Sequence, residues 1–300
     1  MQNNEGNGRR PVFSDWLYQI MEKHAPWFWG IFSVAMVLGL YKWVSLAFLE
    51  KTPYVWDGAF QHIALSLLAI LMMREVYQGE FHLGFTTRRF WQGLLMCWPM
   101  LTFITFNLFA NLGGGKIYGE SLAMALANYF SVGLFEEVIV RAILIGHMMH
   151  HWEGDAHRIR KAVVWSSVIF GVLHIGNVFS NPVGTLIQIL FATGIGILFA
   201  AVYLRTRNLW SCILAHAIND FCAAIDTIYV PLQADIDAYN AALAEVPQIL
   251  VGRIPQETLI SIAPVLQLVS LPLAVFVAIM GIYMMRPAKA KQINQLWAWM

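Results

Sequence analysis

Long apolar stretches recur along the whole chain and constrain its fold more than any other feature of the sequence. A helix needs about 20 predominantly apolar residues to cross the hydrocarbon core of a bilayer. Backbone polar groups in that core must be paired internally, which favours helices. The sequence therefore predicts an all-α polytopic membrane bundle with eight transmembrane helices, at about residues 27–48, 58–73, 90–112, 121–150, 161–180, 183–203, 210–231 and 258–285.

The composition indicates a membrane protein and argues against several other classes. Of the 300 residues, 58% are hydrophobic and only 12% are charged, a balance that is too apolar for a soluble domain. The net charge of +1 gives no general attraction for nucleic acid, so we expect the lipid bilayer as a partner and no nucleic acid. The three cysteines have no paired spacing, which argues against a disulfide framework.

The positions of the positive charges predict the orientation of the bundle, because cytoplasmic loops carry an excess of Lys and Arg. With the N-terminus inside, 14 of the 19 Lys and Arg residues fall in inner segments. Three fall in outer segments (Lys51, Lys116 and Arg253), and the remaining two, Lys42 and Arg141, fall in predicted spans. The sequence therefore predicts an N-in and C-in topology. From the short loops of this compact chain we expect a multi-pass protein of a bacterial plasma membrane.

The stretch LFEEVIVRAIL, residues 134–144, places two glutamates and an arginine inside the fourth predicted span. An ionised side chain at the bilayer centre costs about 2.5–3.5 kcal/mol on insertion scales, so such residues are candidates for function. Residues four apart share a helix face, so Glu137 can pair with Arg141. Glu136 lies about 100° further around the helix and has no partner on its own helix.

Polar residues also occur in two later predicted spans: Phe170, His174 and Asn177 in the fifth, and His216 and Asp220 in the seventh. His216 and Asp220 are four residues apart and can therefore pair on one helix face. A buried carboxylate without a partner on its own helix suits a general base or acid. We expect His174 to be the partner of Glu136 from another helix, around a water-filled cavity inside the bundle.

These motifs, taken together and in order, resemble those of a known family. The chain contains, on successive apolar helices, Glu136-Glu137-x-x-x-Arg141, Phe170-x-x-x-His174 and His216-x-x-x-Asp220. The same succession is the pattern of the CAAX prenyl protease-like family, also called the CPBP or abortive-infection family. The resemblance covers roughly residues 120–230 and implies an intramembrane endopeptidase, a hydrolase.

The resemblance also implies roles for the motif residues. Glu136 and His174 would activate water, and His216 with the residue four positions later would help to hold the oxyanion. That later residue is Asp220, where the family often has asparagine, and Asn219 precedes it. An ionised aspartate cannot donate a hydrogen bond, so Asp220 must be protonated, orient His216 or bind a metal. We expect the site to be supported by Glu137, Arg141, Phe170, Asn177 and Asn219.

These residues leave two mechanisms open. His174, His216 and Glu136 could bind zinc with an open position for water, as in a metalloendopeptidase. The motif histidines are, however, not paired as His-x-x-x-His on one helix. We therefore favour a glutamate-type mechanism without a cofactor.

Two other classes of function are compatible with buried polar residues. A membrane transporter with proton-coupling residues would also place ionisable groups in its spans, although the chain has no internal repeat and no paired broken helices. A catalytically silent membrane protein of the bacteriocin-immunity type could keep the same fold. For an enzyme we expect as substrate a membrane-embedded, membrane-anchored or lipid-modified protein or peptide, and the sequence does not decide whether prenylation is involved.

The predicted spans divide the chain into five segments. We expect a cytoplasmic and interfacial N-terminal segment at 1–26, N-terminal transmembrane helices at 27–118, a CAAX protease-like catalytic core at 119–231, an external loop at 232–257, and a last transmembrane helix with a cytoplasmic tail at 258–300.

Overall fold

The structure is a computed structural model that describes residues 54–76, 82–113, 115–179, 182–232, 237 and 263–298. Within these residues every regular element is helical and no strand occurs, which confirms the all-α prediction. The first predicted span, the N-terminal segment 1–26 and most of the predicted loop 232–257 lie outside the described residues.

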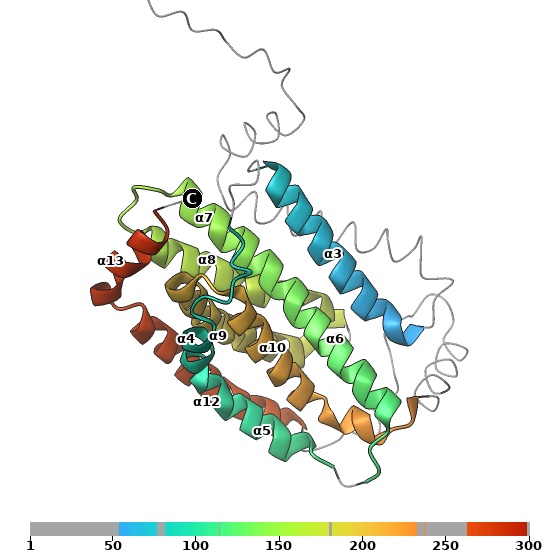
Figure 1. Ribbon diagram of the computed structural model, residues 1–300. Coiled ribbons are helices and arrows are strands. Elements are labelled where there is room, and N and C mark those ends of the chain that lie inside the picture. The colour runs from blue at the N-terminus through green and yellow to red at the C-terminus, as the bar shows by residue number, and fades with distance from the viewer. Residues whose placement is uncertain are drawn as a thin grey trace, which may run out of the picture.

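The helical elements follow one another as shown in Figure 1. They are α3 (Tyr54–Val76), α4 (Phe90–Met96), η2 (Trp98–Met100), α5 (Leu101–Asn111), α6 (Gly119–Glu137), η3 (Val138–Ile145), α7 (Gly146–His151), α8 (Arg158–Val172), η4 (Leu173–Phe179), α9 (Pro182–Thr206), α10 (Leu209–Ala223), η5 (Ile225–Tyr229), α12 (Ala263–Met284) and α13 (Pro287–Leu296). Of the short elements, η2, η4 and η5 are 3₁₀ helices and η3 is a π-helix.

Two of the described helices are long and apolar enough to cross a membrane. They are Arg158–Val178, which comprises α8 and most of η4, and Pro182–Thr206, which is α9. If each of two bent helix pairs is counted as one span, the described part of the chain has up to four such spans. The full set of eight spans and their orientation stay predictions.

The two bent pairs correct the expectation that the chain has no paired broken helices, and each pair breaks close to a proline. Phe90–Met96 and Trp98–Asn111 meet at 45°, and Val269–Met284 and Pro287–Leu296 meet at 71°. Pro99 lies in the first turn of η2, and Pro287 lies in the first turn of α13. Proline lacks the N–H that a continuing helix needs, so it is tolerated at the start of a new helix.

The helix at the centre of the bundle is α9. Its residues from Leu198 to Leu204 have no exposed surface, and its main neighbours are α8 and α12. A Cβ atom on Gly194 would lie 2.8 Å from the carbonyl oxygen of Ala274 in α12. A Cβ atom on Gly281 of α12 would lie 2.9 Å from the Cα atom of Leu198. Glycine at these two positions therefore allows α9 and α12 to approach backbone to backbone, as is common between membrane helices.

A row of helices lies beside this centre. In the row, α6 packs between α3 and α10, and α10 also contacts α5 (Figure 1). The polar motifs lie on α6 and η3, on α8 and η4, and on α10. The site is therefore expected where the row meets α8 and α9.

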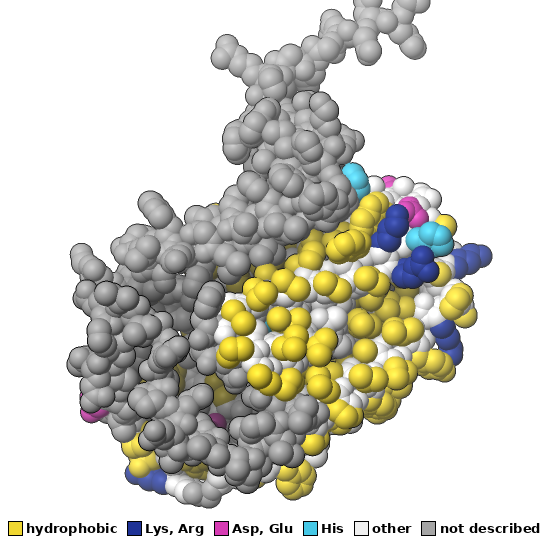
Figure 2. Space-filling model, turned by 180° about the vertical axis from the view of Figure 1, so that it is seen from behind, with side chains coloured by type: hydrophobic (Ala, Val, Ile, Leu, Met, Phe, Trp, Pro, Cys, Tyr) yellow, Lys and Arg dark blue, Asp and Glu magenta, His cyan; other side chains and the backbone are white. Residues whose placement is uncertain are grey.

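The outer surface of the bundle is strongly apolar. Side chains of α8 such as Val164, Trp165, Val168 and Val172 are exposed. Figure 2 shows a broad apolar face with most of the visible Lys, Arg and His side chains at one end. Large exposed apolar areas of this kind mark a surface that contacts lipid or another partner, and here they fit a membrane protein.

We expect Gly281→Ala to destabilise the protein by about 1–3 kcal/mol, because the added methyl group would collide with the backbone of α9. The measurement is thermal unfolding of the purified protein in detergent. Gly119→Ala is the matched control, because a Cβ atom there meets nothing within 4 Å. Equal melting temperatures for the two variants would contradict the close packing of α12 on α9.

Candidate active site

The two glutamates lie where the helix changes type. In place of one α-helix over 121–150, α6 ends at Glu137 and continues directly into the π-helix η3, all eight residues of which are buried. A π-helical segment inside an α-helix is often found at functional sites. The wider π-turn begins immediately after the glutamate pair, so it affects the orientation of Glu136 and Glu137 relative to neighbouring helices.

Gly133 brings this region close to α10. A Cβ atom at Gly133 would lie 3.1 Å from the carbonyl oxygen of Ile213 and 3.2 Å from the backbone nitrogen of Ala217. Gly133 precedes Glu137 by about one helical turn, and Ala217 is next to His216 in the chain. The close approach of the two helices therefore places Glu137 opposite His216.

Glu137 is the centre of a fully buried ion-pair network. Its Oε2 atom lies 3.1 Å from Nε of Arg141, and neither side chain has any exposed surface. The pair spans four residues, as the sequence spacing predicts. The Nδ1–H group of His216 donates to Oε1 of the same carboxylate at 2.9 Å. Glu137 therefore connects Arg141 in η3 to His216 in α10, with one carboxylate oxygen in contact with each residue.

Aromatic rings complete the surroundings of Arg141. Its guanidinium group lies 4.5 Å from the ring centre of Phe170 and 5.7 Å from that of Phe199. Within the described part of the chain, the nitrogens Nη1 and Nη2 have no hydrogen-bond acceptor. Stabilisation of this cation therefore comes from the carboxylate of Glu137 and from the faces of the two rings.

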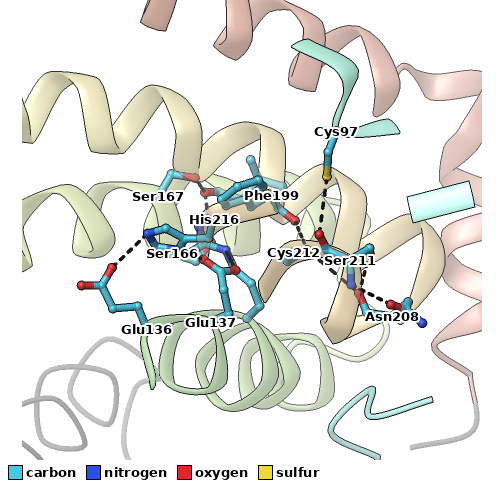
Figure 3. A network of polar contacts seen from close by, with 12 residues as sticks. Cys97, Glu136, Glu137, Ser166, Ser167, Phe199, Asn208, Ser211, Cys212 and His216 are labelled. Carbon is cyan, nitrogen blue, oxygen red and sulfur yellow. Dashed lines mark hydrogen bonds and ion pairs between the residues drawn. The ribbon is translucent and has the colours of Figure 1, made fainter. Parts of the chain in front are cut away.

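The other nitrogen of His216 faces two further carboxylates. Its Nε2 atom lies 3.6 Å from Oε2 of Glu136 and 3.3 Å from Oδ2 of Asp220. Figure 3 shows Glu136 and Glu137 pointing from the same helix toward His216. Glu136 and Asp220 are 24% and 26% exposed, whereas Glu137 is completely buried. One histidine thus lies between a buried carboxylate and two accessible ones.

His216, and not His174, is the histidine within ion-pair distance of Glu136 in the described residues. The Nδ1–H group of His174 donates to the carbonyl oxygen of Phe170 at 3.0 Å. This bond fixes the tautomer of a neutral ring and leaves Nε2 as an acceptor. The Phe170 ring contacts both imidazoles, with ring centres 5.5 Å from His174 and 5.9 Å from His216. The two histidines therefore contact the same aromatic side chain.

Two supporting residues from the sequence lie at the margin of the cluster. Asn219 donates to Oδ1 of Asp220 at 3.2 Å and accepts from the amide of Asn107 at 3.3 Å. Asn177 is exposed on η4 and donates to Gln188 at 2.9 Å, outside the carboxylate–histidine cluster. Asn107 was not identified from the motifs. The sequence feature that could have identified it is an amide side chain within an apolar helix.

The part of the chain that carries these motif residues is similar to a known family. Residues 118–222 match the model of a family described as "Type II CAAX prenyl endopeptidase Rce1-like". Residues 118–222 are therefore similar to an Rce1-like domain. The predicted resemblance to the CAAX prenyl protease-like family is confirmed. No curated protein and no solved structure matches the chain.

The Rce1-like region contains every motif residue from Glu136 to Asp220.

The geometry also tests whether His174, His216 and Glu136 could together hold zinc. No three His, Cys, Asp or Glu side chains of the described residues form a group that could hold a metal ion. Nδ1 of His216 is bound to Glu137, and Nε2 faces two carboxylates. The described residues do not bring His174, His216 and Glu136 together as such a group, so we derive no step through a metal, and the zinc alternative stays a prediction.

We expect Arg141→Ala to lower the stability of the Rce1-like domain by about 3–5 kcal/mol, because it leaves the buried carboxylate of Glu137 without its counter-charge. The measurement is thermal unfolding in detergent, together with the yield of inserted protein. Arg160→Ala is the control, because Arg160 is exposed on α8. An Arg141→Ala protein that is inactive but as stable as the wild type would instead assign the arginine a direct chemical role.

Proposed function

We propose that this chain is an intramembrane endopeptidase, which cleaves a membrane-anchored or lipid-modified protein or peptide with water activated by Glu136 and His174. The proposal is supported by the match to the Rce1-like family. The observation that carries it is the contrast between two adjacent glutamates. Glu137 is buried and paired with Arg141, whereas Glu136 is partly exposed beside His216.

In this proposal Glu136 is the general base. It accepts a proton from water while the water oxygen attacks the carbonyl carbon of the substrate peptide bond. Nε2 of His174, the acceptor nitrogen of the neutral ring, binds and orients the same water. The C–N bond then breaks, and the proton passes from Glu136 to the leaving amine. Apolar helices around the site strengthen each electrostatic contact, because they exclude bulk water.

His216 is proposed as the group that stabilises the oxyanion. Its Nδ1–H bond to Glu137 fixes the ring, so that Nε2 points toward Glu136 and Asp220. A proton on Nε2 can then be donated to the developing negative charge. Asp220 accepts a hydrogen bond from Asn219 at Oδ1, and its Oδ2 atom faces Nε2 of His216. We therefore assign Asp220 to the orientation of His216 and not to direct donation.

The substrate would be held in an adjacent cavity of about 460 Å³. Asn107 lines this cavity and contacts Asn219, which leads to Asp220 and the site. Among the described residues no charged side chain lines the cavity, and its walls combine aromatic residues with amides, namely Phe103, Phe106, Phe191, Asn111 and Gln188. Amides can pair with an extended peptide backbone and the rings can bury apolar side chains, so we place the uncharged segment next to the cleaved bond here.

We further propose that the protein spans a bacterial plasma membrane eight times, with both termini inside and the five-segment organisation predicted from the sequence. The apolar helices of the described residues and the concentration of basic side chains at one end of the bundle support this topology (Figure 2).

We expect Glu136→Gln to reduce cleavage by about 10²–10⁴-fold while the protein stays folded, because the substitution keeps the volume of the side chain and removes the base. Substrates are first identified as membrane proteins that stay uncleaved in cells lacking this chain. The rate is then measured with purified protein. Glu120→Gln, an exposed site at the start of α6, is the matched control. Cleavage by Glu136→Gln at the wild-type rate would refute the assignment of the base, and wild-type protein without cleavage of any membrane protein would favour a silent or transport function.

We expect activity to survive strong chelators, because the proposed base and the water-orienting histidine act without a metal. The measurement combines activity after chelation with the metal content of the purified protein. Zinc bound at about one equivalent, and lost together with activity in His216→Ala, would establish the metal-dependent alternative.

A further inference from the structure

A second polar cavity lies away from the candidate active site, at the end of the bundle where α4, α9 and α13 meet. Its volume is about 440 Å³. Its polar lining consists of two arginines and three glutamines, namely Arg89, Arg205, Gln92, Gln292 and Gln295. No acidic residue of the described parts of the chain lines it.

The two arginines of this cavity are not neutralised within the described residues. The ion pairs found there are formed by other cations, namely Arg141, Lys161 and His216. Two neighbouring arginines have other contacts. Arg207 donates to the carbonyl oxygen of Leu296 at 3.1 Å, and Arg286 donates to the hydroxyl of Tyr283 at 2.6 Å. The cavity therefore presents two positive charges together with amide groups that can donate hydrogen bonds.

The wall that carries Arg89 is held by long-range hydrogen bonds. Arg89 itself has a φ angle of 57°, in the left-handed region that non-glycine residues seldom adopt. The side-chain amide of Asn208 donates to the carbonyl oxygens of Thr86 and Arg88, and the Tyr203 hydroxyl donates to that of Leu83 at 3.1 Å. The segment before α4 is thereby fixed to the end of α9, which carries Arg205.

The opposite wall, α13, is fixed to the same end of α9. Trp297 is buried, and its indole N–H donates to the carbonyl oxygen of Leu204 at 2.8 Å. Arg158 donates to the side chain of Asn294 at 2.8 Å. These contacts hold the segment before α4 and helix α13 at the same end of α9, so the backbone of both walls of the cavity is fixed.

The position of the cavity indicates the class of ligand. Arg205 lies in the last turn of α9, a helix long and apolar enough to span a membrane, so the cavity lies at the end of that helix. Next to it, Trp91, Leu95 and Trp98 are exposed at spacings of four and three residues along the chain. Charge at the end of an apolar helix, beside an apolar surface, is the environment of a phospholipid headgroup and its acyl chains.

We propose that this cavity binds the phosphate of an anionic phospholipid, with Arg89 and Arg205 as its charged ligands and the glutamine amides as further donors. Arginine suits this role because its planar group binds phosphate oxygens through two parallel hydrogen bonds. The apolar surface beside α4 takes the acyl chains. This site is independent of the proposed peptidase chemistry.

The test is native mass spectrometry of the purified full-length protein with added phosphatidylglycerol or phosphatidylcholine. We expect the wild type to retain one phosphatidylglycerol in preference to phosphatidylcholine. The double variant Arg89→Gln/Arg205→Gln should bind phosphatidylglycerol at least about tenfold more weakly, because it loses two charge-assisted contacts. The double variant Arg89→Lys/Arg205→Lys keeps the charges and should retain part of the affinity, which also controls for misfolding.

The control for net charge is Arg160→Gln, because Arg160 is exposed on α8 and does not line the cavity. Equal binding of both lipids by the wild type would overturn the proposal, and so would an equal loss of affinity in Arg160→Gln and in the double glutamine variant. Inorganic phosphate serves as a second probe. If inorganic phosphate binds the wild-type protein and phosphatidylglycerol does not, the ligand is free phosphate and the assignment to a phospholipid is wrong.

Discussion

The buried ion pair between Glu137 and Arg141 is the interaction on which the rest of the site depends. Both side chains are completely excluded from solvent, so each charge requires the other. The second oxygen of Glu137 holds His216 on α10, and the guanidinium group contacts Phe170 on α8 and Phe199 on α9. One pair of charges therefore connects the three regions of sequence that carry the polar motifs.

This pairing explains how two adjacent glutamates can have different roles. Glu137 is paired with Arg141 and His216, whereas Glu136 lies on another face of the helix, is partly exposed and lies 3.6 Å from Nε2 of His216. A rigid network beneath an accessible carboxylate is what general-base catalysis requires, because the base must keep its position as protons move. The buried ion pairs of Glu137 and the partial exposure of Glu136 therefore both suit Glu136 to its proposed role as the base.

The sequence predicted those features that depend on one helix at a time. The all-α class followed from apolar stretches, and the pairs Glu137–Arg141 and His216–Asp220 followed from four-residue spacing. Contacts between helices were not predictable in the same way, because they depend on how far each helix rotates and how closely it packs. The approach at Gly133, the π-helix after Glu137 and the contact between Asn107 and Asn219 belong to this second group. So does the placement of His216 beside Glu136, where the sequence led us to expect His174 as the partner from another helix.

A double-mutant cycle on Glu137 and Arg141 tests the importance of the buried pair most directly. Glu137→Gln, Arg141→Gln and the double variant are compared with the wild type by unfolding in detergent. We predict a coupling energy of at least about 1 kcal/mol, with the double variant less destabilised than the sum of the single variants, because each single change leaves one buried charge unpaired. Additive losses would show that the two charges do not stabilise one another and would contradict the central place given to the pair.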